Sequence, residues 1–364
     1  MQRSALLIGA GIIAALISAC IPQPSDTGPG PKAELGRVMA LDACSSSADF
    51  ATNKVKIIDF DPTTNPGDPV SSVSAGGSGY AVDLNAAFAL APQSFKEQLC
   101  GLDGVFINTH GCSAQNCTSA DPVANSWGLR ESTTRNPSTG GTYIALSAAL
   151  WGAGNPASSH HALENYIFES LLDWHGSGRP AYQSIGSSPS YSRGMAILAA
   201  LAHEFGHVLW FVTNNFDRAP TYDPSGFCSS NFFVGWNTIA AQNPSFIEFA
   251  TVKGTHLFEP QIWQIQNMLP GNPAGANDAI DTFYEPDAQN APGSGSPWAS
   301  LFATFSPEED FVETFKMAVL LNATTPMTSQ PITFPLIGNI RQDIPATLSQ
   351  RAALTAKLSC FNVH

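Results

Sequence analysis

Basic residues are scarce in this chain. Of its 364 residues only 16 are lysine or arginine, against 29 aspartates and glutamates, which gives a formal net charge of -13. A protein with this balance lacks the positive surface that binds nucleic acid or anionic lipid by electrostatics. Charged residues make up 12% of the chain and hydrophobic residues 43%. This composition excludes an intrinsically disordered chain and favours a folded globule.

Long apolar runs are also missing, except near the N-terminus. Arg3 precedes an apolar run from Leu6 to Ile17, and small residues then lead to Cys20. The run is short for a membrane span and is typical of a signal peptide. The residues before Cys20 resemble a bacterial lipobox, which implies a lipoprotein signal peptide over 1–19 and a lipid on Cys20. A plain signal peptide cleaved nearby, or a signal anchor, is the alternative.

The lipobox resemblance implies a protein of the bacterial cell envelope. Residues 20–34 are then the lipidated N-terminus and a flexible tether rich in Pro, Gly and Ser, followed by one folded domain over 35–364. Because Ile21 rather than an acidic residue follows the cysteine, the resemblance implies the outer membrane or the cell surface. The membrane is thus an expected partner, through the lipid anchor.

Six cysteines remain besides Cys20, an even number that fits disulfides in an oxidising compartment. Cys112 and Cys117 lie close together in a Gly-, Ser- and Asn-rich stretch and are expected to close a local loop. The other pairings stay open. A structural zinc site is disfavoured because the cysteines show no repeated CxxC spacing. The six are Cys44, Cys100, Cys112, Cys117, Cys228 and Cys360.

Short apolar segments alternate with turns along the domain and predict both strands and helices. The expected strands span 37–41, 55–60, 105–108 and 143–151. The expected helices span 94–99, 162–174, 195–211 and 307–321, the last with Ser306 as N-cap and Pro307 at its first position. The stretch 270–297, dense in Gly, Pro, Asn and Asp, predicts a long insertion loop.

The expected helix over 195–211 contains the sequence His203-Glu204-Phe205-Gly206-His207. Histidines four residues apart emerge on one face of a helix and can bind a single metal ion. Glu204 could then accept a proton from a metal-activated water and return it to the leaving group. The alternative is a core in which hydrogen bonds satisfy all three groups, but burying them without a metal is costly. Gly206 lowers helix propensity by roughly 1 kcal/mol and indicates a close approach of substrate or another backbone.

This motif resembles the zincin metallopeptidases, whose α+β core has a mixed sheet with a substrate-binding edge strand, a backing helix and an active-site helix. The order of 143–151, 162–174 and 195–211 is similar to that arrangement. The resemblance implies bound Zn2+ and a peptide or protein substrate. The metzincin subclass is excluded, because it requires glycine and histidine where this chain has Trp210 and Thr213.

The segment from Ser306 to Phe315 is similar to the second zinc helix of gluzincins of the anthrax-lethal-factor type. In those enzymes a glutamate four residues ahead of another glutamate binds the metal. The resemblance implies that Glu309 is the third ligand and that Glu313 orients a histidine.

The residues themselves leave other roles open at this helix. Glu308, Asp310, Glu313 and His256 compete with Glu309 as the third ligand, and Glu309 could instead close a capping box with Ser306. The oxyanion stabiliser is unknown. The related enzymes place a tyrosine shortly before the glutamate ligand, where Phe302 and its neighbours offer none, and the distant candidates are Tyr222, Tyr284 and His256.

The sequence therefore predicts a zinc-dependent metallohydrolase, specifically a peptidase, with Glu204 as general base. A catalytically inactive zincin-fold lipoprotein that acts in binding or envelope assembly is the alternative, although such a protein has no need of Glu204. The 7 tryptophans also allow a binder of polysaccharide or cell wall. Aromatic residues at this level more often build the core.

Overall fold

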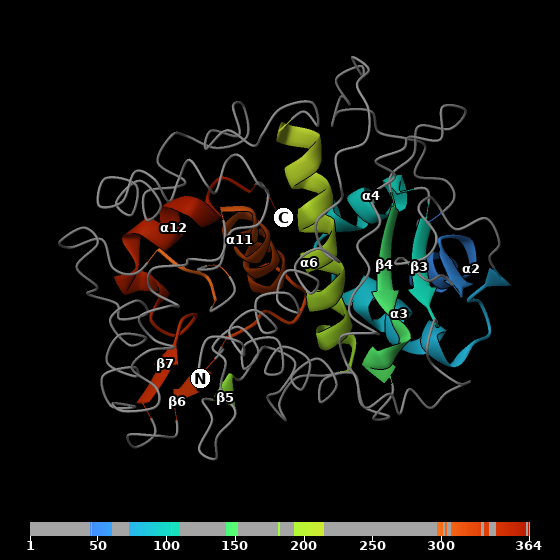
Figure 1. Cartoon of the computed structure of the whole chain (residues 1–364), viewed down its shortest axis with the longest axis horizontal. Helices are drawn as coiled ribbons and strands as arrows, with labels where there is room; N and C mark the ends of the chain where they lie inside the picture. Colours follow the sequence, from blue (N-terminus) through green and yellow to red (C-terminus); the bar gives the residue numbers. More distant parts are fainter. Residues whose placement is uncertain are drawn as a thin grey trace, which may run out of the picture.

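The computed structural model describes part of the chain, namely residues 44, 46–59, 73–102, 104–109, 143–151, 181–182, 193–214, 297–300, 303, 307–328, 331–334, 340–361 and 363. These residues form helices and strands of an α+β structure (Figure 1). Several predicted features lie outside them: Cys20 with its signal peptide and tether, the strand over 37–41, the Cys112–Cys117 pair, the helix over 162–174 and all but the last residue of the 270–297 loop.

The larger sheet is mixed, as the family resemblance implies. Its strands follow the order β2 (Val73–Ser74), β1 (Val55–Ile58), β3 (Gly104–Asn108) and β4 (Tyr143–Ser147). β1, β3 and β4 are parallel to one another, whereas β2 is antiparallel to β1. Parallel neighbours need a crossover connection, and the one between β1 and β3 contains α3 (Gly79–Leu90) and α4 (Gln93–Gly101).

The prediction of a strand over 143–151 is correct only in its first half. The chain is extended to Ser147, and Ala148–Trp151 then forms the 3-10 helix η2. The Ser147 hydroxyl accepts a hydrogen bond from the Ala149 N–H at 3.2 Å. Such local hydrogen bonds of serine favour a turn over a continued strand. The strand β4 therefore ends at Ser147, although the apolar sequence continues to Trp151.

A second sheet, β5 (Ala181–Tyr182), β6 (Pro331–Phe334) and β7 (Ile340–Asp343), is antiparallel and was not predicted. The other unpredicted elements are α2 (Ser47–Asn53), η6 (Leu348–Gln350) and α12 (Ala352–Leu358). Cys44, just ahead of α2, forms a disulfide with Cys100 of α4. The prediction that the chain contains disulfides is therefore confirmed. Among the described helices, none has the length and apolar character needed to cross a membrane.

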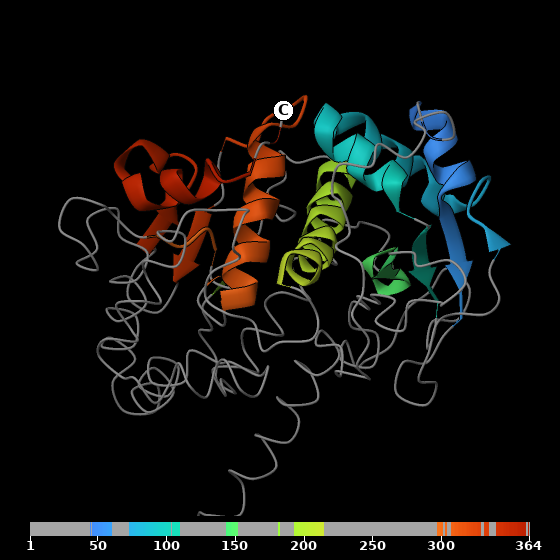
Figure 2. The same cartoon turned by 90° about the horizontal axis from the view of Figure 1, so that it is seen from above.

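Helix α6 (Arg193–Asn214) runs through the middle of the described structure and confirms the helix predicted over 195–211. In Figure 2, α11 (Pro307–Leu321, orange) and α3 (teal) lie on opposite sides of α6 (yellow-green). The stretch from Met195 to Ala202 is buried at every position. A helix covered on several sides is apolar all round, which is why this stretch lacks a polar face.

The helix that packs along the sheet side of α6 is α3, which the sequence analysis did not predict. At Gly194 an added Cβ would lie 3.0 Å from the Ala86 Cβ, so the two helices are in close contact there. Asp83 of α3 is buried and accepts hydrogen bonds from Arg193 at 2.9 and 2.8 Å and from the Trp151 indole at 3.0 Å. Asp83 thus ties α3 to the start of α6 and to the end of η2.

Aromatic side chains join α6 to its neighbours around Phe205, which lies between His203 and His207. Phe205 packs edge-on against Phe95 of α4, with ring centroids 5.5 Å apart, and its ring lies 6.0 Å from that of Phe315 in α11. Phe361, just after α12, packs edge-on against Phe315 and Phe311. These contacts fix α11 and the C-terminal segment relative to α6.

Candidate metal centre

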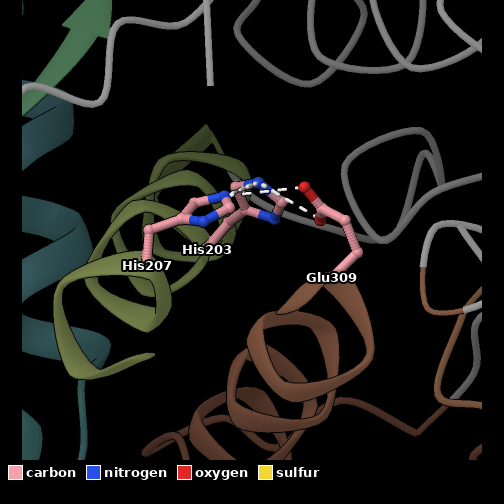
Figure 3. Close-up of side chains that lie close together, drawn as sticks. All are labelled: His203, His207 and Glu309. Carbon is pink, nitrogen blue, oxygen red and sulfur yellow. Dashed lines mark hydrogen bonds and ion pairs between the residues drawn. The ribbon is translucent and has the colours of Figure 1, made fainter. Parts of the chain in front are cut away.

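His203 and His207 of α6 and Glu309 of α11 point toward one another (Figure 3). The Nε2 atoms of the two histidines are 3.3 Å apart. The Glu309 carboxylate lies 3.7 Å from the His207 Nε2 and 4.0 Å from the His203 Nε2. One ligand atom from each residue therefore lies within 4.8 Å of the other two, and the group could hold a metal ion.

The spacing of the group fits a small tetrahedral cation. Two imidazole nitrogens bound to zinc at 2.0–2.1 Å with a tetrahedral angle are about 3.4 Å apart. The observed 3.3 Å between the histidine nitrogens matches that separation. Two imidazoles and one carboxylate are a donor set that zinc accepts, and three protein ligands leave a fourth position for water or substrate.

His203 is held in one orientation by Glu313, a further glutamate of α11. The His203 Nδ1 is 2.7 Å from Oε1 of Glu313. Burial alone would raise the pKa of Glu313, but the Lys316 ammonium and His203 outweigh it and hold that pKa well below its usual range. An ionised carboxylate only accepts hydrogen bonds, so Nδ1 carries the proton and the lone pair of Nε2 faces the cluster.

His203 is also held neutral. Burial lowers its pKa from 6.5 to about 4, although the contact with Glu313 opposes the change. A neutral imidazole is the form that binds a metal ion, and a carboxylate on the far nitrogen is the usual way to fix its tautomer.

Glu204 follows His203 in α6 and is 1% exposed. Burial raises its pKa from 4.5 to about 7, against the opposing effects of His207 and Lys316. A carboxyl group with a pKa near the working pH is suited to both take up and release a proton. The protonation chemistry expected of a general base is therefore available beside the cluster.

Glu313 has two more partners, which the sequence analysis missed. Lys316 lies 2.7 Å from its Oε1, and the Ser300 hydroxyl donates to its Oε2. The spacing of Glu313 and Lys316, three residues apart on one helix, is a signal that could have revealed the first contact. Nothing in the sequence marks Ser300, because it reaches the site from an irregular segment ahead of α11.

Asp310, a competing third ligand in the sequence analysis, makes a different contact. It is buried and pairs with Lys357 of α12, whose Nζ lies 2.5 Å from its Oδ2. The same ammonium lies 4.8 Å from the centre of the Trp298 ring. Burial lowers the pKa of Lys357, and Asp310 opposes that shift.

The glycine of the motif lies where the two ligand-bearing helices meet. A Cβ added at Gly206 would lie 3.0 Å from the Val312 Cα and 3.1 Å from its Cγ1. The predicted close approach of another backbone at this position is therefore confirmed. A side chain here would force α11 away from α6, and with it the carboxylate of Glu309.

The remaining sequence candidates, Tyr222, Tyr284 and His256, lie outside the described residues, as does Phe302, so the oxyanion stabiliser stays unknown. The side chain of Glu308 lies outside the described part as well. No protein-family model, curated protein or solved structure matches this chain.

Proposed function

We propose that this protein is a zinc-dependent metallohydrolase, a peptidase of the gluzincin type with a zincin fold. The observation that carries the proposal is the convergence of His203, His207 and Glu309 from two helices, with their ligand atoms within 4.8 Å of one another. The contact between His203 and Glu313 supports it, because metal-binding histidines commonly donate their second ring nitrogen to a carboxylate.

Zinc, when bound, supplies a Lewis acid that polarises a carbonyl and makes water a stronger acid. Glu204 would take the proton of the attacking water and pass it to the leaving amine. A carboxylate whose pKa burial raises to about 7 takes a proton from water more readily than an ordinary glutamate does, and the resulting acid is still strong enough to protonate an amine. The burial of Glu204 beside the ligands thus supports hydrolysis rather than metal storage.

The sheet supports a peptide as substrate. Of the described strands, only β3 pairs with β4, so β4 ends the order of the sheet within that part of the structure. An edge strand offers backbone groups to an extended peptide. Contact between β4 and α6 brings this strand next to the ligand-bearing helix.

We place this activity at the bacterial cell envelope, on the strength of the lipobox-like sequence that ends in Cys20. A lipid on Cys20 would anchor the domain to the outer membrane or cell surface. Recovery of the Cys20→Ala protein from membranes in the same amount as the unaltered protein would contradict the anchor and leave the enzymatic proposal untouched.

The enzymatic proposal is tested by Glu204→Gln in the full chain. We expect one zinc per chain in both proteins by elemental analysis, and a loss of peptide hydrolysis of about 10²–10⁴-fold in the variant, the range for removal of a general base. Glu97→Gln, an exposed glutamate of α4, is the matched control and should keep full activity. A folded protein that takes up no zinc, or a Glu204→Gln variant with full activity, would show that the proposal is wrong.

A further inference from the structure

Glu313 receives hydrogen bonds from three side chains. Its Oε1 lies 2.7 Å from the His203 Nδ1 and 2.7 Å from the Lys316 Nζ, and its Oε2 accepts from the Ser300 hydroxyl. Glu313, Ser300 and Lys316 are all at most 2% exposed. Water therefore has little access to this group, and the protein itself supplies the donors for the carboxylate.

The direction of each bond follows from the partners. The Ser300 oxygen accepts the Ala303 N–H at 3.2 Å, so its single proton is free to go to Glu313. The Lys316 ammonium can only donate. With both oxygens of Glu313 already accepting from these two residues, the remaining role for the His203 Nδ1 is that of a third donor.

We propose that Ser300 and Lys316 are positioning residues, which keep Glu313 as an acceptor for the His203 Nδ1–H. The Nε2 lone pair of His203 then points toward His207 and Glu309, where a metal ion would bind. Both side chains contact Glu313, and Glu313 contacts His203, so Ser300 and Lys316 can act on the histidine through this glutamate. The hydrogen bonds of Glu313 alone determine the His203 tautomer. Its consequence for metal affinity rests on the proposed function.

A purely structural role is the competing explanation, since buried ion pairs also hold helices together. The chain provides a control for that explanation in Lys357, which pairs with Asp310 of the same helix at 2.5 Å. Both lysines are buried at 1–2% exposure and both meet a buried carboxylate of α11. Lys316 shares its carboxylate with a histidine of the cluster, whereas Asp310 is bound by a lysine of α12.

The experiment follows the tautomer of His203 in the full chain, labelled with 15N-histidine and freed of metal by chelation. Two-bond proton–nitrogen correlations distinguish a protonated from an unprotonated ring nitrogen, and loss of the signals in His203→Gln assigns them. We expect the unaltered protein to show the proton on Nδ1 alone. Ser300→Ala and Lys316→Met should each add a visible population with the proton on Nε2.

Zinc affinity is then measured on the same variants by competition with a chelator. We expect Ser300→Ala and Lys316→Met to weaken zinc binding by about ten- to a hundredfold, the range for residues that orient a metal ligand through hydrogen bonds. Lys316→Arg, which keeps a charged donor, should retain the Nδ1 tautomer. Lys357→Met should lower the melting temperature but change neither the tautomer nor the affinity.

The outcomes separate this inference from the proposed function. An unchanged tautomer in Ser300→Ala and Lys316→Met, with zinc bound normally by the unaltered chain, overturns the positioning role alone. A tautomer that shifts as expected in a chain that takes up no zinc overturns the proposed function alone. If Lys316→Met does not fold, Ser300→Ala decides, and an unaltered His203 tautomer in it counts against the inference.

Discussion

Helix α6 meets α3 on one side and α11 on the other, and the chemistry of the two contacts differs. On the α3 side, Gly194 packs against Ala86 and Leu90, and one buried carboxylate, Asp83, is neutralised by Arg193. On the α11 side, Gly206 packs against Val312 with equal closeness, but the buried His207, the partly exposed His203 and several carboxyl groups lie between the helices. Both contacts bring backbones close together, and only one accumulates titratable groups.

The difference indicates which contact serves stability and which serves chemistry. Apolar packing lowers the free energy of the folded state without needing buried charge. Burying several ionisable groups in one place is costly unless they are paired or bind a metal. We infer that the α3 contact is mainly structural and that the α11 contact accepts a cost in stability for its function.

The largest expected effect comes from removing a carboxylate on the α11 side. Glu309→Ala should release zinc at ordinary chelator concentrations and abolish turnover, because two imidazoles alone bind the metal weakly. Were Glu309 only a helix cap, the loss would be about 1 kcal/mol of stability with zinc binding unchanged. Elemental analysis after dialysis against chelator measures the difference.

Asp83→Asn is the matching change on the α3 side. This variant should lose stability, because Asp83 bonds both Arg193 and Trp151, but it should keep full zinc occupancy. Full occupancy in Glu309→Ala, combined with loss of zinc in His256→Ala, would instead assign the third ligand to His256 and reject the gluzincin type.

The sequence revealed the α11 side of this comparison better than the α3 side. The helices over 195–211 and 307–321 were predicted correctly, because an apolar run surrounds the histidine motif and Ser306-Pro307 is a strong helix start. Helix α3 was missed because its sequence, GYAVDLNAAFAL, places apolar and small residues on all sides and shows no helical period. Its helical state is favoured by burial, which no local pattern encodes.

The residues of the candidate site could likewise be predicted only in part. The spacing of His203 and His207 indicates a shared ligand face, and Glu309 and Glu313 were assigned by resemblance to a family. Ser300 could not have been found, since its contact with Glu313 depends on how the segment 297–300 lies against α11. A residue that reaches the site from a separate segment, as Ser300 does, depends on tertiary packing and leaves no local signature, whereas Lys316 is three residues from Glu313 on the same helix and does leave one.

A second, smaller effect concerns the pH dependence of stability in the metal-free protein. The pKa of His203 is lowered from 6.5 to about 4, so between these values the unfolded chain binds a proton that the folded chain does not, and stability rises with pH. The pKa of Glu204 is raised from 4.5 to about 7, so its contribution is complete below pH 4.5 and is lost as the pH rises toward 7. Between about pH 4.5 and 6.5, where both groups titrate, His203 and Glu204 therefore change the stability in opposite directions.

Removing one of the two groups should expose the other. We expect metal-free Glu204→Gln to gain stability with rising pH between about 4 and 6.5, by at most about 3 kcal/mol relative to the unaltered protein. Urea unfolding at several pH values measures this change. The exposed Glu97→Gln control should follow the unaltered protein, and parallel curves for all three proteins would show that the buried pair does not titrate as described.

The smallest expected effect tests the two glycine contacts directly. Gly206→Ala and Gly194→Ala each place a Cβ 3.0 Å from atoms of the facing helix, the Val312 Cα in one case and the Ala86 Cβ in the other. Overpacking of this kind costs about 1–3 kcal/mol, partly offset by the better helix propensity of alanine, about 1 kcal/mol. The two variants should therefore lose similar, modest amounts of stability.

Their zinc affinities should differ. At Gly206 the obstacle is the backbone of α11, which cannot rotate away, so α11 must shift and carry Glu309 away from the histidines. We expect about a tenfold loss of zinc affinity in Gly206→Ala, about 1.4 kcal/mol, and none in Gly194→Ala, where the strain falls on α3. Chelator competition measures both. An equal loss of affinity in the two variants would mean that α3 supports the metal site as much as α11 does, and the division of α6 into a structural side and a chemical side would be wrong.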